Sequence, residues 1–240
     1  MALDGLEGRL QRHFKGRHKV NLVRFADDFV ITGATRALLE DEVKPLVVQF
    51  LAERGLELSE EKTRIVHIDQ GFDFLGFNVR KYNGKLLINP AKSSIAAVKE
   101  NYRGIVKAGV SLRQDALIRR LNPFIRGWGN YYRHVVSNRI FVDIDHAIWR
   151  MTWSWAKRRH PQKGLKWVKD RYYSRRDGRD WVFTDGSVTL FRMATIPIRR
   201  HVKVRGDANP YDPQEARYFA ERHARRGNQP PATPPPWLPL

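Results

Sequence analysis

Two adjacent carboxylates, Asp27 and Asp28, are the residues whose type and spacing most directly suggest chemistry. Apolar and β-branched runs flank them on both sides, which predicts a β-hairpin over residues 20–31 with both acids at the turn. Such a pair is also compatible with an ordinary solvated turn. Two neighbouring acids repel each other, however, and a divalent cation such as Mg²⁺ would offset this repulsion because it prefers carboxylate oxygens.

A second group of candidates lies further along the chain, where basic side chains alternate with aromatic rings. Arginine makes bidentate contacts with phosphate, and flat rings stack on unpaired bases, so these residues are candidates for RNA binding. They are Arg126, Tyr131, Tyr132, Arg133, Lys157, Arg158, Arg159, Arg199, Arg200 and Lys203. Lys99, Arg103 and Lys107 join them because they repeat every fourth residue, and like charges at that helical spacing suit an anion. A solvated surface is the alternative for the charges, and core packing for Trp128 and one tyrosine.

The net charge of +19 is unevenly distributed. Residues 1–90 carry 14 Lys and Arg against 13 Asp and Glu, whereas residues 91–240 carry 30 against 12, together with all seven tryptophans. This predicts a polyanion-binding part next to a nearly neutral, acid-bearing part. The chain has no cysteine, which excludes disulfides and any cysteine-ligated zinc site, so we expect no zinc.

No secretory signal and no long apolar run is visible, so we expect a cytoplasmic, bacterial-type protein that associates with nucleic acid and not with a membrane.

The periodicity of apolar residues predicts an α+β fold. Residues 1–90 should form an antiparallel sheet with a helix on one face, the helix being kinked or split at Pro45. The pattern favours strands at 65–68 and 72–77 and a hairpin turn at 83–84. A helical bundle is predicted over 91–160, with a new helix starting at 122–123. A basic extension over 161–227 should follow, with a hairpin around 185–186. The chain should end in a disordered proline-rich tail at 228–240.

The segment from Phe25 to Asp28, Phe-Ala-Asp-Asp between two apolar strands, resembles the Tyr-Ala-Asp-Asp motif of the reverse transcriptase palm. Further stretches resemble the later palm and the maturase domain of group II intron-encoded proteins. They are residues 24–30, 55–63, 72–77, 121–133 and 201–213. Phe25 departs from the family's usual tyrosine by a single hydroxyl.

This resemblance implies a two-metal site for Mg²⁺, with Asp27 and Asp28 supplying two of the family's three acidic ligands. It places Lys62 near the nucleotide triphosphate. It also implies a primer grip, the hairpin on which the primer end rests, formed by Phe74, Leu75, Gly76 and Phe77. The implied partners are group II intron RNA, which the maturase domain helps to fold for splicing, and an RNA template with a DNA primer.

In relatives, the third palm acid and the finger segments precede the Asp-Asp hairpin, and the sequence upstream of residue 27 contains neither. Two expectations follow. A separate fragment with the fingers and proximal palm completes a reverse transcriptase, or the chain is a non-catalytic RNA-binding remnant of a truncated intron-encoded protein.

Overall fold

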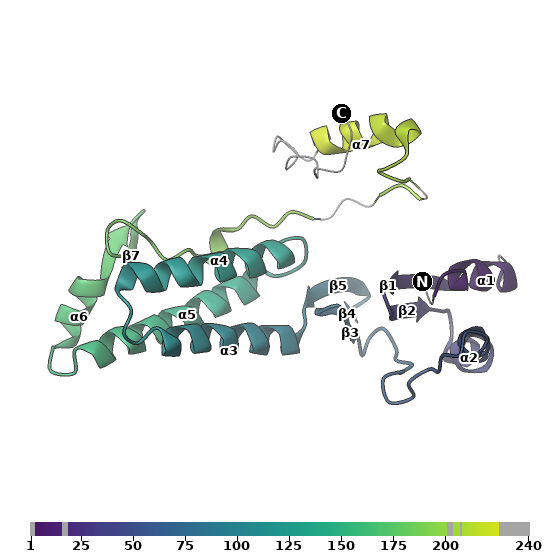
Figure 1. Cartoon of the computed structure of the whole chain (residues 1–240), viewed down its shortest axis with the longest axis horizontal. Helices are drawn as coiled ribbons and strands as arrows, with labels where there is room; N and C mark the ends of the chain where they lie inside the picture. Colours follow the sequence, from purple (N-terminus) through teal and green to yellow (C-terminus); the bar gives the residue numbers. More distant parts are fainter. Residues whose placement is uncertain (1–2, 16–18, 201–203, 207, 226–240) are drawn as a thin grey trace. The chain divides into compact units, whose positions relative to one another are not determined.

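The computed structural model describes residues 3–15, 19–200, 204–206 and 208–225. The chain divides into two units, Met1–Arg200 and His201–Leu240 (Figure 1). Its helices and small antiparallel sheets confirm a mixed α and β fold. Within the described ranges, no helix has the length and apolar character needed to cross a membrane.

The N-terminal part of the first unit is a β-hairpin with helices packed on one of its faces. Its elements are α1 (Leu6–His13), β1 (Asn21–Phe25), β2 (Asp28–Thr32), the π-helix η1 (Leu38–Val43) and α2 (Lys44–Ala52). Leu22, Phe29 and Ile31 on the inner face of the hairpin pack against buried side chains of the helices. The helices therefore give this hairpin one covered face and one open face.

Pro45 marks a change in helix type, as its predicted effect on the helix suggested. A π-helical turn precedes the proline, and α2 contains it in its first turn, where a missing N–H is tolerated. Thr35 caps the start of this helical segment, because its hydroxyl accepts a hydrogen bond from the backbone N–H of Leu38 at 3.2 Å.

A three-stranded antiparallel sheet follows, formed by β3 (Phe72–Phe74), β4 (Phe77–Tyr82) and β5 (Lys85–Pro90). The hairpin turn at residues 83–84 is confirmed, with both residues in the left-handed region. The prediction of one buried strand over 72–77 was wrong, because a second turn divides it into β3 and the start of β4. The segment 65–68 is not a strand.

The bundle consists of three long helices, α3 (Lys92–Ala108), α4 (Gln114–Tyr132) and α5 (Asn138–Arg159), which lie side by side (Figure 1). Apolar residues at helical spacing form its core. Among the fully buried side chains are Tyr102, Leu117, Ile118, Leu121, Ile125, Phe141, Ile144 and Ile148. The three helices lie within the predicted range of 91–160.

The prediction of a new helix at Asn122-Pro123 was wrong, because α4 runs without interruption through Pro123. Asn122 does not cap a helix. Its side-chain oxygen accepts from the N–H of Phe191 at 2.7 Å, and its amide donates to the carbonyl of Thr189 at 3.0 Å. The polar residue that suggested a helix start instead holds a distant segment against α4.

The same core continues beyond the bundle into α6 (Leu165–Tyr172), β6 (Tyr173–Arg176), β7 (Arg179–Phe183) and the 3₁₀-helix η2 (Met193–Thr195). β7 pairs with β6 around a turn at residues 177–178. At the hairpin predicted around residues 185–186, the structure has only an isolated bridge between Thr184 and Thr189.

The segment 189–199, here called the strap, is irregular and is held on the bundle by a partly buried acid. Asp145 of α5 accepts hydrogen bonds from the backbone N–H groups of Met193 at 2.8 Å and Ala194 at 2.9 Å. Gly129 of α4 lies directly under the strap. These contacts satisfy backbone groups that no helix or strand satisfies.

The second unit contains the 3₁₀-helix η3 (Pro213–Glu215) and α7 (Ala216–Arg225). Arg205 makes a bidentate ion pair with Glu215, with distances of 2.6 and 2.7 Å. The Tyr218 hydroxyl accepts from the backbone N–H of Arg205 at 2.8 Å. The predicted tail at 228–240 lies outside the described residues.

Two glycines of α4 give a matched pair for testing the packing under the strap. A Cβ on Gly129 would lie 2.3 Å from Ile196 Cδ1 and 2.9 Å from Met193 Cγ, whereas one on Gly127 would meet nothing within 4 Å. We predict that Gly127→Ala raises the free energy of unfolding by about 1 kcal/mol through helix propensity. Gly129→Ala should lower it by about 1–3 kcal/mol through overpacking. Urea unfolding of both variants checks this, and a gain in stability for both would contradict the close contact.

The second prediction concerns pH. Burial raises the pKa of Asp145 to about 6, although two backbone N–H groups favour the charged form. Because the folded-state pKa lies above the unfolded one, this group contributes stability that is fully present below pH 3.8 and is lost as the pH rises through about 6. We expect the stability of the native protein, relative to Asp145→Asn, to fall by about 2 kcal/mol between pH 4 and pH 7. Urea unfolding along this range measures the difference, and an advantage that grows with pH would contradict the raised pKa.

Candidate active site and nucleic-acid interface

The aspartate pair lies at the tip of the hairpin formed by β1 and β2. Phe25 pairs with Asp28, so Ala26 and Asp27 are the two turn residues and Asp28 is the first residue of β2. The predicted hairpin is confirmed. Of the two acids predicted at its turn, Asp27 lies in the turn and Asp28 lies one residue beyond it. Ala26 takes a φ of 54°, a conformation that is strained for a residue with a side chain.

Both carboxylates are exposed, and within the described ranges neither makes a hydrogen bond or an ion pair. By strand alternation, Asp28 shares the open face of the hairpin with Val23 and Phe25, which are 55% and 63% exposed. Oxygen ligands with this access suit Mg²⁺, which proteins often hold through one or two carboxylates together with phosphate and water. The pair therefore fits the ion, although the described residues contain no group of three acidic, histidine or cysteine ligands.

Lys62 is exposed in a turn that begins at Ser59. The turn is closed by Thr63, whose N–H and hydroxyl both donate to the Ser59 carbonyl, at 3.0 and 2.7 Å. In the part of the chain that the structure describes, no hydrogen bond or ion pair joins Lys62 to Asp27 or Asp28. The lysine is thus available to an anionic ligand.

The predicted primer grip is a sharp turn between β3 and β4. Phe74 pairs with Phe77, and the turn residues Leu75 and Gly76 have φ values of 51° and 80°. This left-handed conformation is natural for glycine and strained for leucine. Gly76 is a residue typical of such a turn, but the apolar Leu75 before it made the segment resemble a continuous strand.

Helices α3 and α4 hold this turn by its carbonyl oxygens. Tyr131 donates to the Leu75 carbonyl at 3.2 Å, and Tyr132 and Ser94 donate to the Gly76 carbonyl at 3.0 and 3.2 Å. A Cβ on Gly76 would lie 2.8 Å from the Tyr132 hydroxyl oxygen, so only glycine fits. Burial raises the pKa of Tyr132, which keeps this hydroxyl protonated as a donor. Ser94 was not among the predicted site residues, since nothing in its sequence context marks it.

The two predicted RNA-contacting tyrosines therefore differ in their surroundings. Tyr132 is 4% exposed and its ring belongs to the core, so the structure gives it a supporting position. Tyr131 is 51% exposed and stacks on Phe77 with ring centroids 5.3 Å apart. Trp128, for which core packing was preferred, is partly buried against that core. One face of Tyr131 remains open beside the predicted primer grip.

Several of the predicted RNA-binding cations have partners within the protein. Arg126 lies over the ring of Phe191 at 4.0 Å, and Arg103 is paired with Glu100. The guanidinium of Arg159 donates to the carbonyls of Val110 and Leu112, at 2.7 and 2.8 Å. Arg133 donates to Asn130 at 3.4 Å. These contacts hold the side chains in place.

Other predicted cations face solvent. Lys107 and Arg158 are exposed on α3 and α5. Arg199, the last residue of the strap, and Arg200 are also exposed. Lys99 is half-buried, and Lys157 is exposed with its ammonium 5.8 Å from the ring of Trp153. Lys203 lies outside the described residues. The exposed members are free to meet phosphate groups.

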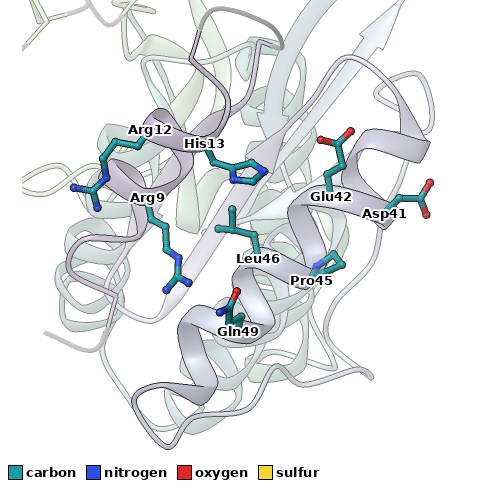
Figure 2. A pocket seen from close by; sticks show the side chains of 8 residues that line it. All are labelled: Arg9, Arg12, His13, Asp41, Glu42, Pro45, Leu46 and Gln49. Atoms are coloured by element: carbon teal, nitrogen blue, oxygen red, sulfur yellow. The ribbon is translucent and has the colours of Figure 1, made fainter.

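Two hollows lie among the described residues, and Asp27 and Asp28 line neither of them. One, of about 610 Å³, lies between α1 and the start of α2 (Figure 2). Arg9, Arg12 and His13 line it from α1, and Asp41 and Glu42 line it from the π-helical turn. The other is a mainly apolar groove of about 660 Å³ between α3 and α4, lined in part by Phe124, Trp128 and Tyr131.

Comparisons with known proteins give two adjacent family matches. The family described as reverse transcriptase (RNA-dependent DNA polymerase) matches residues 1–79, which include the aspartate pair and the turn at 75–76. The family described as group II intron, maturase-specific domain matches residues 95–173, which include α4, α5 and all of α3 except its first three residues. A search of curated proteins found no match. The two matches, in this order along one chain, show that the protein belongs to the group II intron reverse transcriptase/maturase family.

Proposed function

We propose that residues 1–90 are the distal part of a reverse transcriptase palm and that the helical bundle is a thumb and maturase domain that binds intron RNA. The exposed Asp27 and Asp28, without a partner among the described residues, are the observation that carries the first half. A structural role for two adjacent acids would normally show as an ion pair or a cap, and neither is present for the described residues.

In this proposal Asp27 and Asp28 hold Mg²⁺ through their carboxylate oxygens, and the ion supplies charge stabilisation for phosphoryl transfer when it is bound. Lys62 neutralises phosphate charge on the nucleotide. The turn at Leu75 and Gly76 supports the primer end, and the hydroxyls of Tyr131 and Tyr132 fix the position of that turn. Each residue then acts by binding or orienting.

The second half of the proposal rests on the distribution of charge. The excess of basic residues lies in residues 91–240, which include the match to the maturase domain. Exposed cations such as Lys107, Arg158 and Arg200 neutralise phosphates, and the intron RNA is the polyanion that the family implies.

The second candidate function is RNA binding without catalysis. The number of acidic metal ligands among the described residues favours it. Two-metal catalysis in this family uses three acids, and the described residues contain no group of three potential metal ligands. A separately supplied proximal palm and fingers would distinguish the two candidates by adding the third acid.

The third prediction tests the metal site directly. We expect Mn²⁺, followed by electron paramagnetic resonance with a deoxynucleoside triphosphate present, to bind the native chain and to bind at least about tenfold more weakly after Asp27→Asn with Asp28→Asn. Asp177→Asn is the matched control, since Asp177 is an exposed acid in the turn of another hairpin. Equal Mn²⁺ binding by all three proteins would remove the metal site and favour the non-catalytic candidate.

The fourth prediction tests phosphate contact on α5. Arg158→Gln should weaken binding of a structured RNA and reduce the slope of log K against log salt concentration by about one, because one fewer phosphate is neutralised. The free energy of unfolding should stay within about 0.5 kcal/mol of the native value, since Arg158 is exposed.

Arg159→Gln is the matched comparison on the same helix. It removes hydrogen bonds to the carbonyls of Val110 and Leu112, so its main effect should be on stability. Filter binding between 50 and 300 mM salt and urea unfolding separate the two effects. An unchanged salt slope for Arg158→Gln would move the RNA surface to another face, with Lys99, Arg103 and Lys107 next in line.

A further inference from the structure

A row of aromatic rings runs along α5 and is completed by a ring from β7. It consists of His146, Trp149 and Trp153 at helical spacing, and Trp181. The ring planes of His146 and Trp149 are 9° apart with centroids separated by 5.8 Å, and those of Trp149 and Trp153 are 5° apart at 6.5 Å. Trp181 stands nearly perpendicular to both tryptophans, at 5.8 and 5.2 Å. We call these four residues the aromatic row.

Core packing explains only part of this arrangement. Trp149 and Trp153 pack partly against the bundle core, but His146 is exposed and Trp181 is 37% exposed. Trp181 also has a φ of 63°, a left-handed conformation that is strained for a bulky side chain, at a β-bulge where the register between β6 and β7 shifts. Such strain persists where the surrounding structure imposes it, and it concentrates at ligand-binding sites.

Cations accompany the rings. The ammonium of Lys157 lies 5.8 Å from the ring centroid of Trp153, and that of Lys169 lies 5.0 Å from that of Trp181. Residues 146–182 contain 11 lysines and arginines against three aspartates. The surroundings of the aromatic row are therefore complementary in charge to a nucleic acid backbone.

We propose that the aromatic row is a stacking surface for unpaired RNA bases, with Lys157 and Lys169 contacting the adjoining phosphates. Flat rings next to cations are the combination that binds single-stranded nucleic acid with little sequence preference. A paired helix hides its base faces and offers mainly phosphates, so it would not use the rings. This inference deepens the proposed RNA-binding function and rests on it, because it assigns one surface and one form of RNA to the maturase domain.

The test uses the full chain with a labelled oligouridylate and a blunt RNA duplex of equal length. Trp181→Gly removes the ring and relieves the backbone strain. It should weaken oligouridylate binding by about tenfold, a typical loss for one stacked base, and leave duplex binding unchanged. Trp181→Phe keeps a flat ring and should retain most of the affinity. In the native protein, oligouridylate should also quench tryptophan fluorescence, and less so in Trp181→Phe.

Trp167→Ala is the matched control, since Trp167 is a 40% exposed tryptophan on α6 outside the aromatic row. It should bind oligouridylate as the native chain does. Thermal unfolding checks the fold of each variant, and His146→Ala replaces Trp181→Gly if the latter does not fold, because His146 is exposed and its loss should weaken oligouridylate binding selectively.

Unchanged oligouridylate affinity in the folded aromatic-row variants would overturn the inference, and so would an equal loss of oligouridylate and duplex binding. If all variants bind RNA with the native affinity and the native salt dependence, the aromatic row is not the binding surface. The proposed RNA-binding function would then still stand. A chain that binds neither RNA would reject the proposed RNA-binding function itself.

Discussion

The hydrogen bonds from helix hydroxyls to the carbonyls of Leu75 and Gly76 are the interaction on which the candidate site depends most. A left-handed leucine costs about 1–2 kcal/mol, and carbonyls at a tight turn need donors. Tyr131 and Tyr132 of α4 supply donors to these carbonyls. Their rings also pack on Phe77, which helps to offset the cost of the left-handed leucine. The turn lies in the reverse transcriptase match and the tyrosines lie in the maturase match, so these bonds join the two family segments physically.

The strap, residues 189–199, is likewise held in place by side chains of the helices that bond to its backbone groups. An irregular segment can lie on a helical core only if its backbone groups find partners, and Asp145 and Asn122 supply them from α5 and α4. At Asp145 burial outweighs the contacts that oppose it, because it raises the pKa although two N–H groups and Arg192, at 3.5 Å, favour the charged form. Side-chain to backbone hydrogen bonds thus determine where the irregular parts of this chain lie.

Local patterns were enough to predict the helical bundle, the Asp-Asp hairpin and the turn at 83–84, since each has its own periodicity or turn residues. The failures came where distant contacts decide the outcome. Asn122-Pro123 reads as a helix start, but burial of Leu121 and Ile125 in the core carries α4 across the proline. Leu75 reads as part of a strand, but its turn is held by donors outside the strand pattern, among them the hydroxyls of Tyr131 and Tyr132, more than fifty residues away. The aspartate pair was predictable because its chemistry is local.

The structure also separates charged side chains that build the fold from those that remain available for a ligand. Arg159 and Arg103 were selected from the sequence by charge alone, yet both have partners within the protein. Asp27, Asp28 and Arg158 were selected in the same way, and in the described ranges their charged groups make no hydrogen bond or ion pair. An exposed charge without a partner adds little to stability, so its position on a rigid element is better explained by something that binds there. The proposed function assigns a ligand to two of these unpartnered positions, a metal-bound phosphate to the hairpin tip and an RNA backbone to the exposed surface of α5.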